Sequence, residues 1–132
     1  MRAVPEDLLA KEVGSLVQRL RLWTPTRWAV TCEPWGTRAD LVRHVAQWCA
    51  DHAADLEGEP RRTLSVLGSD LLVADQLAVT GDDLLRAGPG PELRAAAVKH
   101  LLAHRFDLLG EAPPASLGGS EAVARGREAC AL

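Results

Sequence analysis

Four runs of apolar residues with helical spacing divide this chain, and each is separated from the next by proline or glycine. The runs cover about residues 5–23, 37–57, 69–87 and 91–109. Recurrence of apolar side chains every three or four positions is typical of α-helices that bury one face. The sequence therefore predicts an all-α fold, an up-down-up-down four-helix bundle with the short connections that antiparallel neighbours allow.

The apolar positions are mainly Leu, Ala and Val, and the chain contains no Ile. Leu and Ala are among the best helix formers, so the composition agrees with an all-α fold. Gly14 lies inside the first run, where a glycine costs about 1 kcal/mol relative to alanine, and we expect it to mark a close contact between helices. Gly81 lies inside the third run and weakens the expectation of a continuous helix there.

The chain is predicted to have two parts, a helical domain over residues 1–110 and a tail over residues 111–132. A length of 132 residues fits one domain with a single core. From Gly110 onward, proline and glycine break every periodic pattern, and the remaining residues are small or polar. We therefore expect the tail to be flexible and to add little to the core.

Charge and hydropathy limit the kinds of partner that this protein is expected to bind. The net charge of −3 gives no basic field that would attract nucleic acid. No apolar run approaches the roughly 20 residues that a membrane span needs. Charged residues near the N-terminus occupy the place where a signal peptide would have its apolar core. We expect a cytoplasmic protein that binds neither nucleic acid nor membrane.

Three of the four tryptophans lie between the end of the first helical run and the start of the second, at Trp23, Trp28 and Trp35. Such large apolar side chains are unusual in a linker, so this segment is predicted to be an ordered loop. Two interpretations remain open. The loop could cover one end of the core, or it could form the wall of a pocket.

Two histidines, His100 and His104, stand four positions apart in the last helical run. On an α-helix this spacing places both imidazoles on one face, where they could bind the same metal ion. Asp107 lies one turn beyond His104, where a carboxylate could orient a ligand imidazole. The alternative is that these are ordinary, partly buried helical histidines. A further histidine far upstream, His44, favours the metal interpretation.

The residues around His44 resemble a known pattern. In the run from Trp35 to Val45, the residues Thr37, Asp40, Leu41, Val42 and His44 occur in the order found at the start of the second helix in the DinB-like superfamily. The run His100-x-x-x-His104-Arg105-Phe106-Asp107 resembles a later helix of the same superfamily. That superfamily includes the N-terminal domain of mycothiol-dependent maleylpyruvate isomerases, which this chain resembles.

This resemblance implies a divalent metal, Zn²⁺ or Ni²⁺, held by His44, His100 and His104 with one position open. In relatives that position is thought to activate a low-molecular-weight thiol, such as mycothiol, for transfer or isomerisation. Three arginines would then bind carboxylates of the thiol or of its electrophilic substrate: Arg38, Arg43 and Arg105.

Several alternatives stay open on sequence alone. His52 points more squarely toward the core than His44 and competes with it as the metal ligand of its helix. Cys49 is a candidate nucleophile, although its place on the apolar stripe is typical of a core cysteine. The chain could also be a helical bundle without chemistry, acting as a binding module or a homodimer. If the chain is instead an enzyme, the expected binding partner is a small thiol or an electrophilic substrate.

Overall fold

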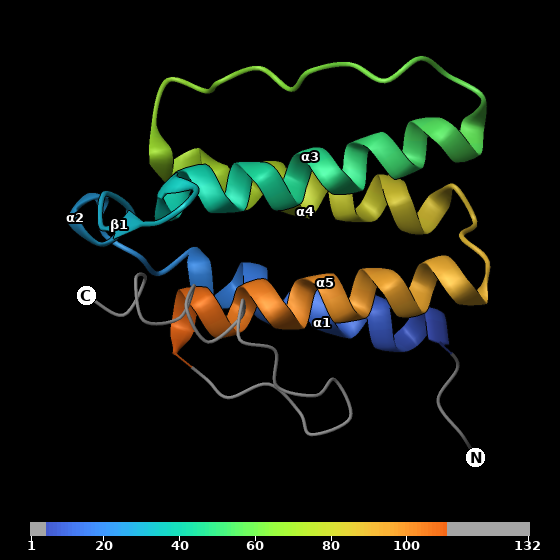
Figure 1. Cartoon of the computed structure of the whole chain (residues 1–132), viewed down its shortest axis with the longest axis horizontal. Helices are drawn as coiled ribbons and strands as arrows, with labels where there is room; N and C mark the ends of the chain where they lie inside the picture. The colour runs from blue at the N-terminus through green and yellow to red at the C-terminus, as the bar shows by residue number, and fades with distance from the viewer. Residues whose placement is uncertain (1–4, 111–132) are drawn as a thin grey trace.

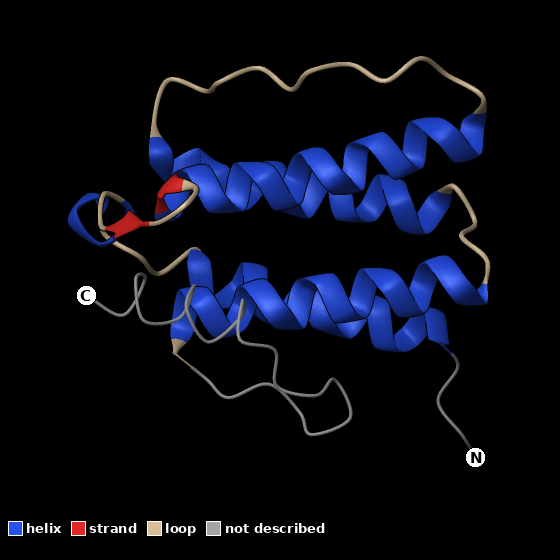
Figure 2. Ribbon diagram, viewed as in Figure 1, coloured by secondary structure: helices blue, strands red, loops and turns tan. Residues whose placement is uncertain are grey.

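The computed structural model describes residues 5–110, which form four long helices with a small hairpin at one end (Figure 1). The elements are α1 (Pro5–Leu20), α2 (Pro25–Trp28), β1 (Thr31–Cys32), β2 (Gly36–Thr37), α3 (Arg38–Glu57), the 3₁₀ turn η1 (Asp70–Leu72), α4 (Val73–Arg86) and α5 (Pro91–Leu109). Figure 2 shows how little of this part is strand. The prediction of a mostly helical chain is confirmed, whereas the predicted tail, residues 111–132, lies outside the described residues.

The helix ends are fixed by local sequence. The Thr37 side chain accepts a hydrogen bond from the backbone N–H of Asp40, and the Asp40 carboxylate accepts one from the backbone N–H of Thr37, so the two form a capping box at the start of α3. Gly58 ends α3 in the left-handed conformation, with φ of 70°, and Gly110 ends α5 in the same way, with φ of 73°. Pro91 is the first residue of α5, where its missing N–H costs nothing.

The connection between α3 and α4 runs back along α3. Arg61 pairs with Asp55 near the end of α3. Further along, the backbone N–H of Leu64 donates to the side-chain oxygen of Gln47, two turns closer to the start of α3. Later residues of the 58–69 connection therefore contact earlier residues of α3. The chain thus returns to the end of the molecule where α3 began.

As a result, α4 runs parallel to α3 (Figure 1). An ion pair between Arg43, in the second turn of α3, and Asp70, in η1, joins the two starting points. The expected up-down-up-down order is therefore wrong, because the prediction assumed a short connection between α3 and α4. About 12 extended residues reach about 40 Å, enough to span a helix of about 30 Å such as α3.

α1 and α4 run antiparallel. Arg21, just after α1, pairs with Asp75 in the first turn of α4. Val13, further back in α1, contacts Gly81 in the second half of α4. The two pairs progress in opposite directions along the two helices, so the end of α1 lies beside the start of α4.

The fourth long helix, α5, packs against both α1 and α3. It runs antiparallel to α3, because His44 neighbours His104 while Trp48, one turn later, neighbours His100. The four long helices thus fall into two parallel pairs, α1 with α5 and α3 with α4, and the two pairs run in opposite directions (Figure 1).

The core between these helices is aliphatic, as the composition predicted. Its most completely buried large side chains include Leu9, Leu16, Leu20, Leu41, Leu77, Leu84 and Leu101. Trp23 and Trp28 close one end of this core, with ring centroids 4.8 Å apart. No helix within residues 5–110 combines the length and the apolar character that crossing a membrane requires.

Candidate metal centre

His44, His100 and His104 come together between α3 and α5. His44 lies in the second turn of α3, and the other two stand one turn apart in the second half of α5. Each offers one ring nitrogen, and the three nitrogens lie within 4.8 Å of one another. A single ion with Zn–N distances of about 2.0–2.1 Å could reach three nitrogens at such separations after small side-chain adjustments. The cluster could therefore hold a metal ion.

The cluster opens to solvent on the His44 side. His44 is exposed, whereas His100 and His104 are only partly accessible. The ring centroid of His44 lies 5.8 Å from that of His100 and 5.7 Å from that of His104, and the two rings on α5 are 4.5 Å apart. Two imidazoles inside the cluster and one at its rim would give an ion a route of entry and a side from which a small molecule could approach.

Burial favours the neutral imidazoles that bind metal. Desolvation, reinforced by the neighbouring histidines, lowers the pKa of His100 to about 3. Desolvation and the proximity of His104 also lower the pKa of His44. The Nε2 atom of His100 is buried and has no hydrogen-bond partner in the described part of the chain. A buried ring nitrogen without a partner is costly, and a metal ion would satisfy it.

Two tryptophans pack against these imidazoles. Trp35, from the hairpin, lies 4.3 Å from His44 and 5.4 Å from His104 between ring centroids. Trp48 stacks on His100 at 4.6 Å. Trp23 and Trp28 thus cover one end of the core, as the first interpretation predicted, whereas Trp35 packs against the histidine cluster. The role of Trp48 was missed, although its position one turn after His44 places it on the same face.

His52 does not join the cluster. Its ring packs against Trp48, with centroids 4.1 Å apart. Among the described residues, the only group of three metal-ligating side chains with converging donor atoms contains His44 rather than His52. His44 and His52 are two turns apart on α3, and the His100 and His104 pair of α5 lies beside His44.

The three arginines expected to bind carboxylates have different surroundings. Arg43 pairs with Asp40 and Asp70, and Arg105 pairs with Glu12 of α1 at 3.3 Å. The Arg38 guanidinium lies over the ring of Trp23, 5.4 Å from its centroid. Burial and the nearby Arg27 lower the pKa of Arg38 from its ordinary value. These contacts leave anion binding by the three arginines a prediction.

Cys49 belongs to the core. Its side chain is buried, and desolvation raises the pKa of its thiol to about 12. A nucleophilic cysteine needs a lowered pKa, because the thiolate is the reactive form. This environment disfavours the nucleophile interpretation and agrees with a small apolar side chain in the interior.

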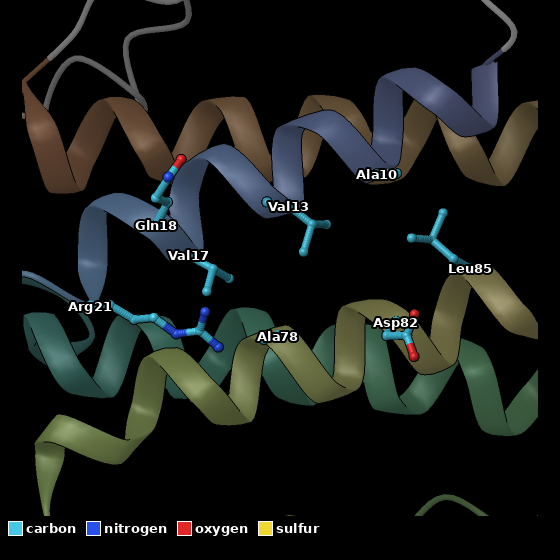
Figure 3. A pocket seen from close by; sticks show the side chains of 9 residues that line it. Ala10, Val13, Val17, Gln18, Arg21, Ala78, Asp82 and Leu85 are labelled. Atoms are coloured by element: carbon cyan, nitrogen blue, oxygen red, sulfur yellow. The ribbon is translucent and has the colours of Figure 1, made fainter.

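A separate groove lies between α1 and α4 (Figure 3). Its volume is about 440 Å³, and its lining includes Val13, Val17 and Leu85. Arg21 and Asp82 contribute charge toward its two ends (Figure 3). No histidine lines this groove, so its chemistry differs from that of the histidine cluster.

Comparisons of the chain with protein-family models, with curated proteins and with solved structures give no match.

Proposed function

We propose that this protein is a metal-dependent enzyme that uses a low-molecular-weight thiol in a transfer or isomerisation reaction. The metal would be Zn²⁺ or Ni²⁺, held by His44, His100 and His104. The observation that carries the proposal is the convergence of three ring nitrogens within 4.8 Å from two facing helices, with one of the three imidazoles exposed. Three protein ligands with an accessible side are typical of catalytic rather than structural metal sites.

The donor set fits a borderline divalent ion. Imidazole nitrogen suits Zn²⁺ and Ni²⁺, whereas Mg²⁺ and Ca²⁺ prefer oxygen ligands. A bound ion of this kind would favour the thiolate form of a thiol that reached it. Burial would keep His44 and His100 neutral, Trp48 would cover His100, and the thiol would approach past His44.

Sequence resemblance supports the thiol as the second component of the proposal. The residues from Thr37 to His44, together with the His100 and His104 pair, resemble the DinB-like superfamily, whose members include mycothiol-dependent enzymes. On this proposal the fold is a four-helix bundle of DinB-like type, and the protein acts in the cytoplasm. Arg38, Arg43 and Arg105 would bind carboxylates, Arg43 and Arg105 by exchanging their present partners.

Metal analysis tests the first half of the proposal. Protein purified without a histidine tag should contain Zn²⁺ or Ni²⁺ near one ion per chain by elemental mass spectrometry. After removal of metal by a chelator, calorimetric titration with Zn²⁺ should show one site. A wild-type protein that is isolated without metal and that also fails to bind added Zn²⁺ would refute the proposed site.

Thiol binding tests the second half. Cobalt-loaded protein should develop a thiolate-to-cobalt charge-transfer absorption when 2-mercaptoethanol is added. The His104→Ala variant treated in the same way is the control, because it should hold no cobalt at the site. A cobalt spectrum that thiols leave unchanged would separate metal binding from thiol chemistry and remove the second half.

One observation favours a second candidate function, a binding or dimerisation role. An apolar groove of about 500 Å³ runs between α4 and the connection before it, and the exposed side chains of Leu72 and Val79 line it. Exposed apolar surface of this kind often marks an interaction site. Light scattering after gel filtration should then show an oligomer that Val79→Glu dissociates.

A further inference from the structure

Asp107 is a buried carboxylate near the end of α5. Only 8% of its surface is exposed, and its neighbours in the chain, Phe106 and Leu108, are also buried. A carboxylate removed from water is costly unless a hydrogen-bonding or charged partner compensates it. The environment of Asp107 therefore raises the question of which group serves as that partner.

In the described part of the chain, the one ionisable partner of Asp107 is His104, one turn earlier on the same helix. The Nδ1 atom of His104 lies 3.7 Å from Oδ2 of Asp107, and both side chains are about nine-tenths buried, at 12% and 10% exposure. Neither Nδ1 of His104 nor Oδ1 of Asp107 has a hydrogen-bond partner within residues 5–110. Two buried polar groups thus face each other, and Oδ1 of the carboxylate has no other partner among the described residues.

The separation is slightly longer than a hydrogen bond. A charge-assisted N–H···O contact is about 2.7–2.9 Å long, so closing the gap requires a movement of roughly 1 Å. Rotation of the two side chains on a continuous helix could supply that movement without moving the backbone. The arrangement becomes a hydrogen bond only if the proton of a neutral His104 ring is on Nδ1, since the carboxylate is an acceptor.

We propose that Asp107 is a positioning residue of the metal centre. Asp107 accepts a hydrogen bond from Nδ1 of His104 and thereby keeps Nε2 of that ring unprotonated and directed toward His44 and His100. This inference rests on the proposed metal site and adds the residue that sets the tautomer and orientation of one ligand. Carboxylates that orient ligand imidazoles in this way typically contribute 10–100-fold to metal affinity.

The test compares Asp107→Asn with a matched control, Glu12→Gln. Both changes neutralise a largely buried carboxylate that pairs with a side chain of α5, but Glu12 pairs with Arg105 rather than with a histidine. Urea unfolding of both variants verifies that they fold. Titration with Co²⁺, followed by its visible absorption, should show a 10–100-fold weaker site and a changed spectrum for Asp107→Asn. Glu12→Gln should match wild type in both.

A second measurement does not depend on metal. In chelator-treated wild-type protein, long-range ¹H–¹⁵N correlation spectra should show His104 with its proton on Nδ1. In Asp107→Asn the Nε2-protonated form should become substantial, because a neutral amide is a weaker acceptor than a carboxylate. A structural role alone would leave the tautomer unchanged.

The outcomes separate this inference from the proposed function. Equal cobalt affinity and equal spectra for wild type and Asp107→Asn would overturn the inference while leaving the metal site standing. A wild-type His104 protonated on Nε2 would also overturn it. If wild type binds no cobalt at all, the metal site fails first, and the positioning role fails with it even if the tautomer is as expected.

Discussion

Gly81 of α4 lies so close to Val13 of α1 that a Cβ atom at position 81 would be 2.8 Å from Cγ1 of Val13. This contact reverses the expectation for the two helical glycines. Gly81 was expected to weaken the continuity of its helix, but α4 is continuous around it and the glycine is buried at a helix–helix contact. Gly14 was expected to mark such a contact, but it is exposed and a Cβ there would meet nothing within 4 Å.

Alanine at these two glycines should have opposite effects on stability. Gly81→Ala should lower the free energy of unfolding by about 1–3 kcal/mol, because the added methyl group forces α1 and α4 apart. Gly14→Ala should raise it by about 0.5–1 kcal/mol, because alanine loses less backbone entropy in a helix and has room there. Urea unfolding followed by circular dichroism measures both, and effects of equal sign would contradict the packing described.

Replacing histidines singly should identify the ligands. His104→Ala should abolish stoichiometric metal binding, because two imidazoles remain. His52→Ala should retain it, because the His52 ring packs on Trp48 outside the cluster. Elemental analysis of the two tag-free variants measures their metal content. A metal-free His52→Ala protein beside a metal-containing His44→Ala protein would mean that the wrong histidine of α3 had been chosen.

Acid should destabilise the metal-free protein through His100. The pKa of His100 is about 3 in the folded state against 6.5 ordinarily, so below pH 6.5 the unfolded chain binds a proton that the folded chain does not. The free energy of unfolding should therefore fall as the pH drops from about 6.5, by at most about 1.4 kcal/mol per pH unit for one group. The lowered pKa of His44 acts in the same direction.

Urea unfolding in the presence of a chelator, at pH 7 and pH 5, measures this dependence. The His100→Ala variant should lose less stability between the two pH values than wild type does. Bound metal should steepen the dependence of the wild-type protein, since protons compete for the same nitrogens. An unchanged pH dependence in His100→Ala would show that His100 is not held neutral by burial.

Arg43 should be important for stability because it joins α3 to η1. Its guanidinium donates to Asp40 at 2.9 Å and also pairs with Asp70, while only 21% of its side chain is exposed. Arg43→Ala should lower the free energy of unfolding by about 1–2 kcal/mol, after allowance for the partly exposed partners. Arg61→Ala, which removes a more exposed pair with Asp55, should cost clearly less, because solvent screens that pair. Equal losses would contradict a special role for Arg43.

Cys49 should be unreactive in the folded protein. Its thiol is buried and has a pKa of about 12, so almost no thiolate forms at pH 8. Iodoacetamide followed by peptide mass spectrometry should find Cys49 unmodified in native protein and modified after denaturation in urea. Rapid modification of the native protein at this position would restore Cys49 as a candidate nucleophile.

The positions of the helices followed from the sequence because their signals are local. Thr37 and Asp40 cap α3, and Gly58 ends it, all within a few residues of the boundary they set. The His100 and His104 pair could also be recognised from the sequence, because a spacing of four positions places two side chains on one helical face whatever surrounds the helix. Apolar periodicity likewise identified the core-forming face before any packing was known.

The direction of the helices, and which histidine of α3 joins the cluster, depended on contacts between residues far apart in the chain. The parallel course of α4 rests on pairs such as Gln47 with Leu64, which no local pattern reports. His44 rather than His52 meets the pair on α5 because of how α3 and α5 align, and no pattern within α3 reports that alignment. Local sequence determines where a helix begins, ends and turns its apolar face. Which residues of two helices meet is decided only when all the side chains of the core pack together.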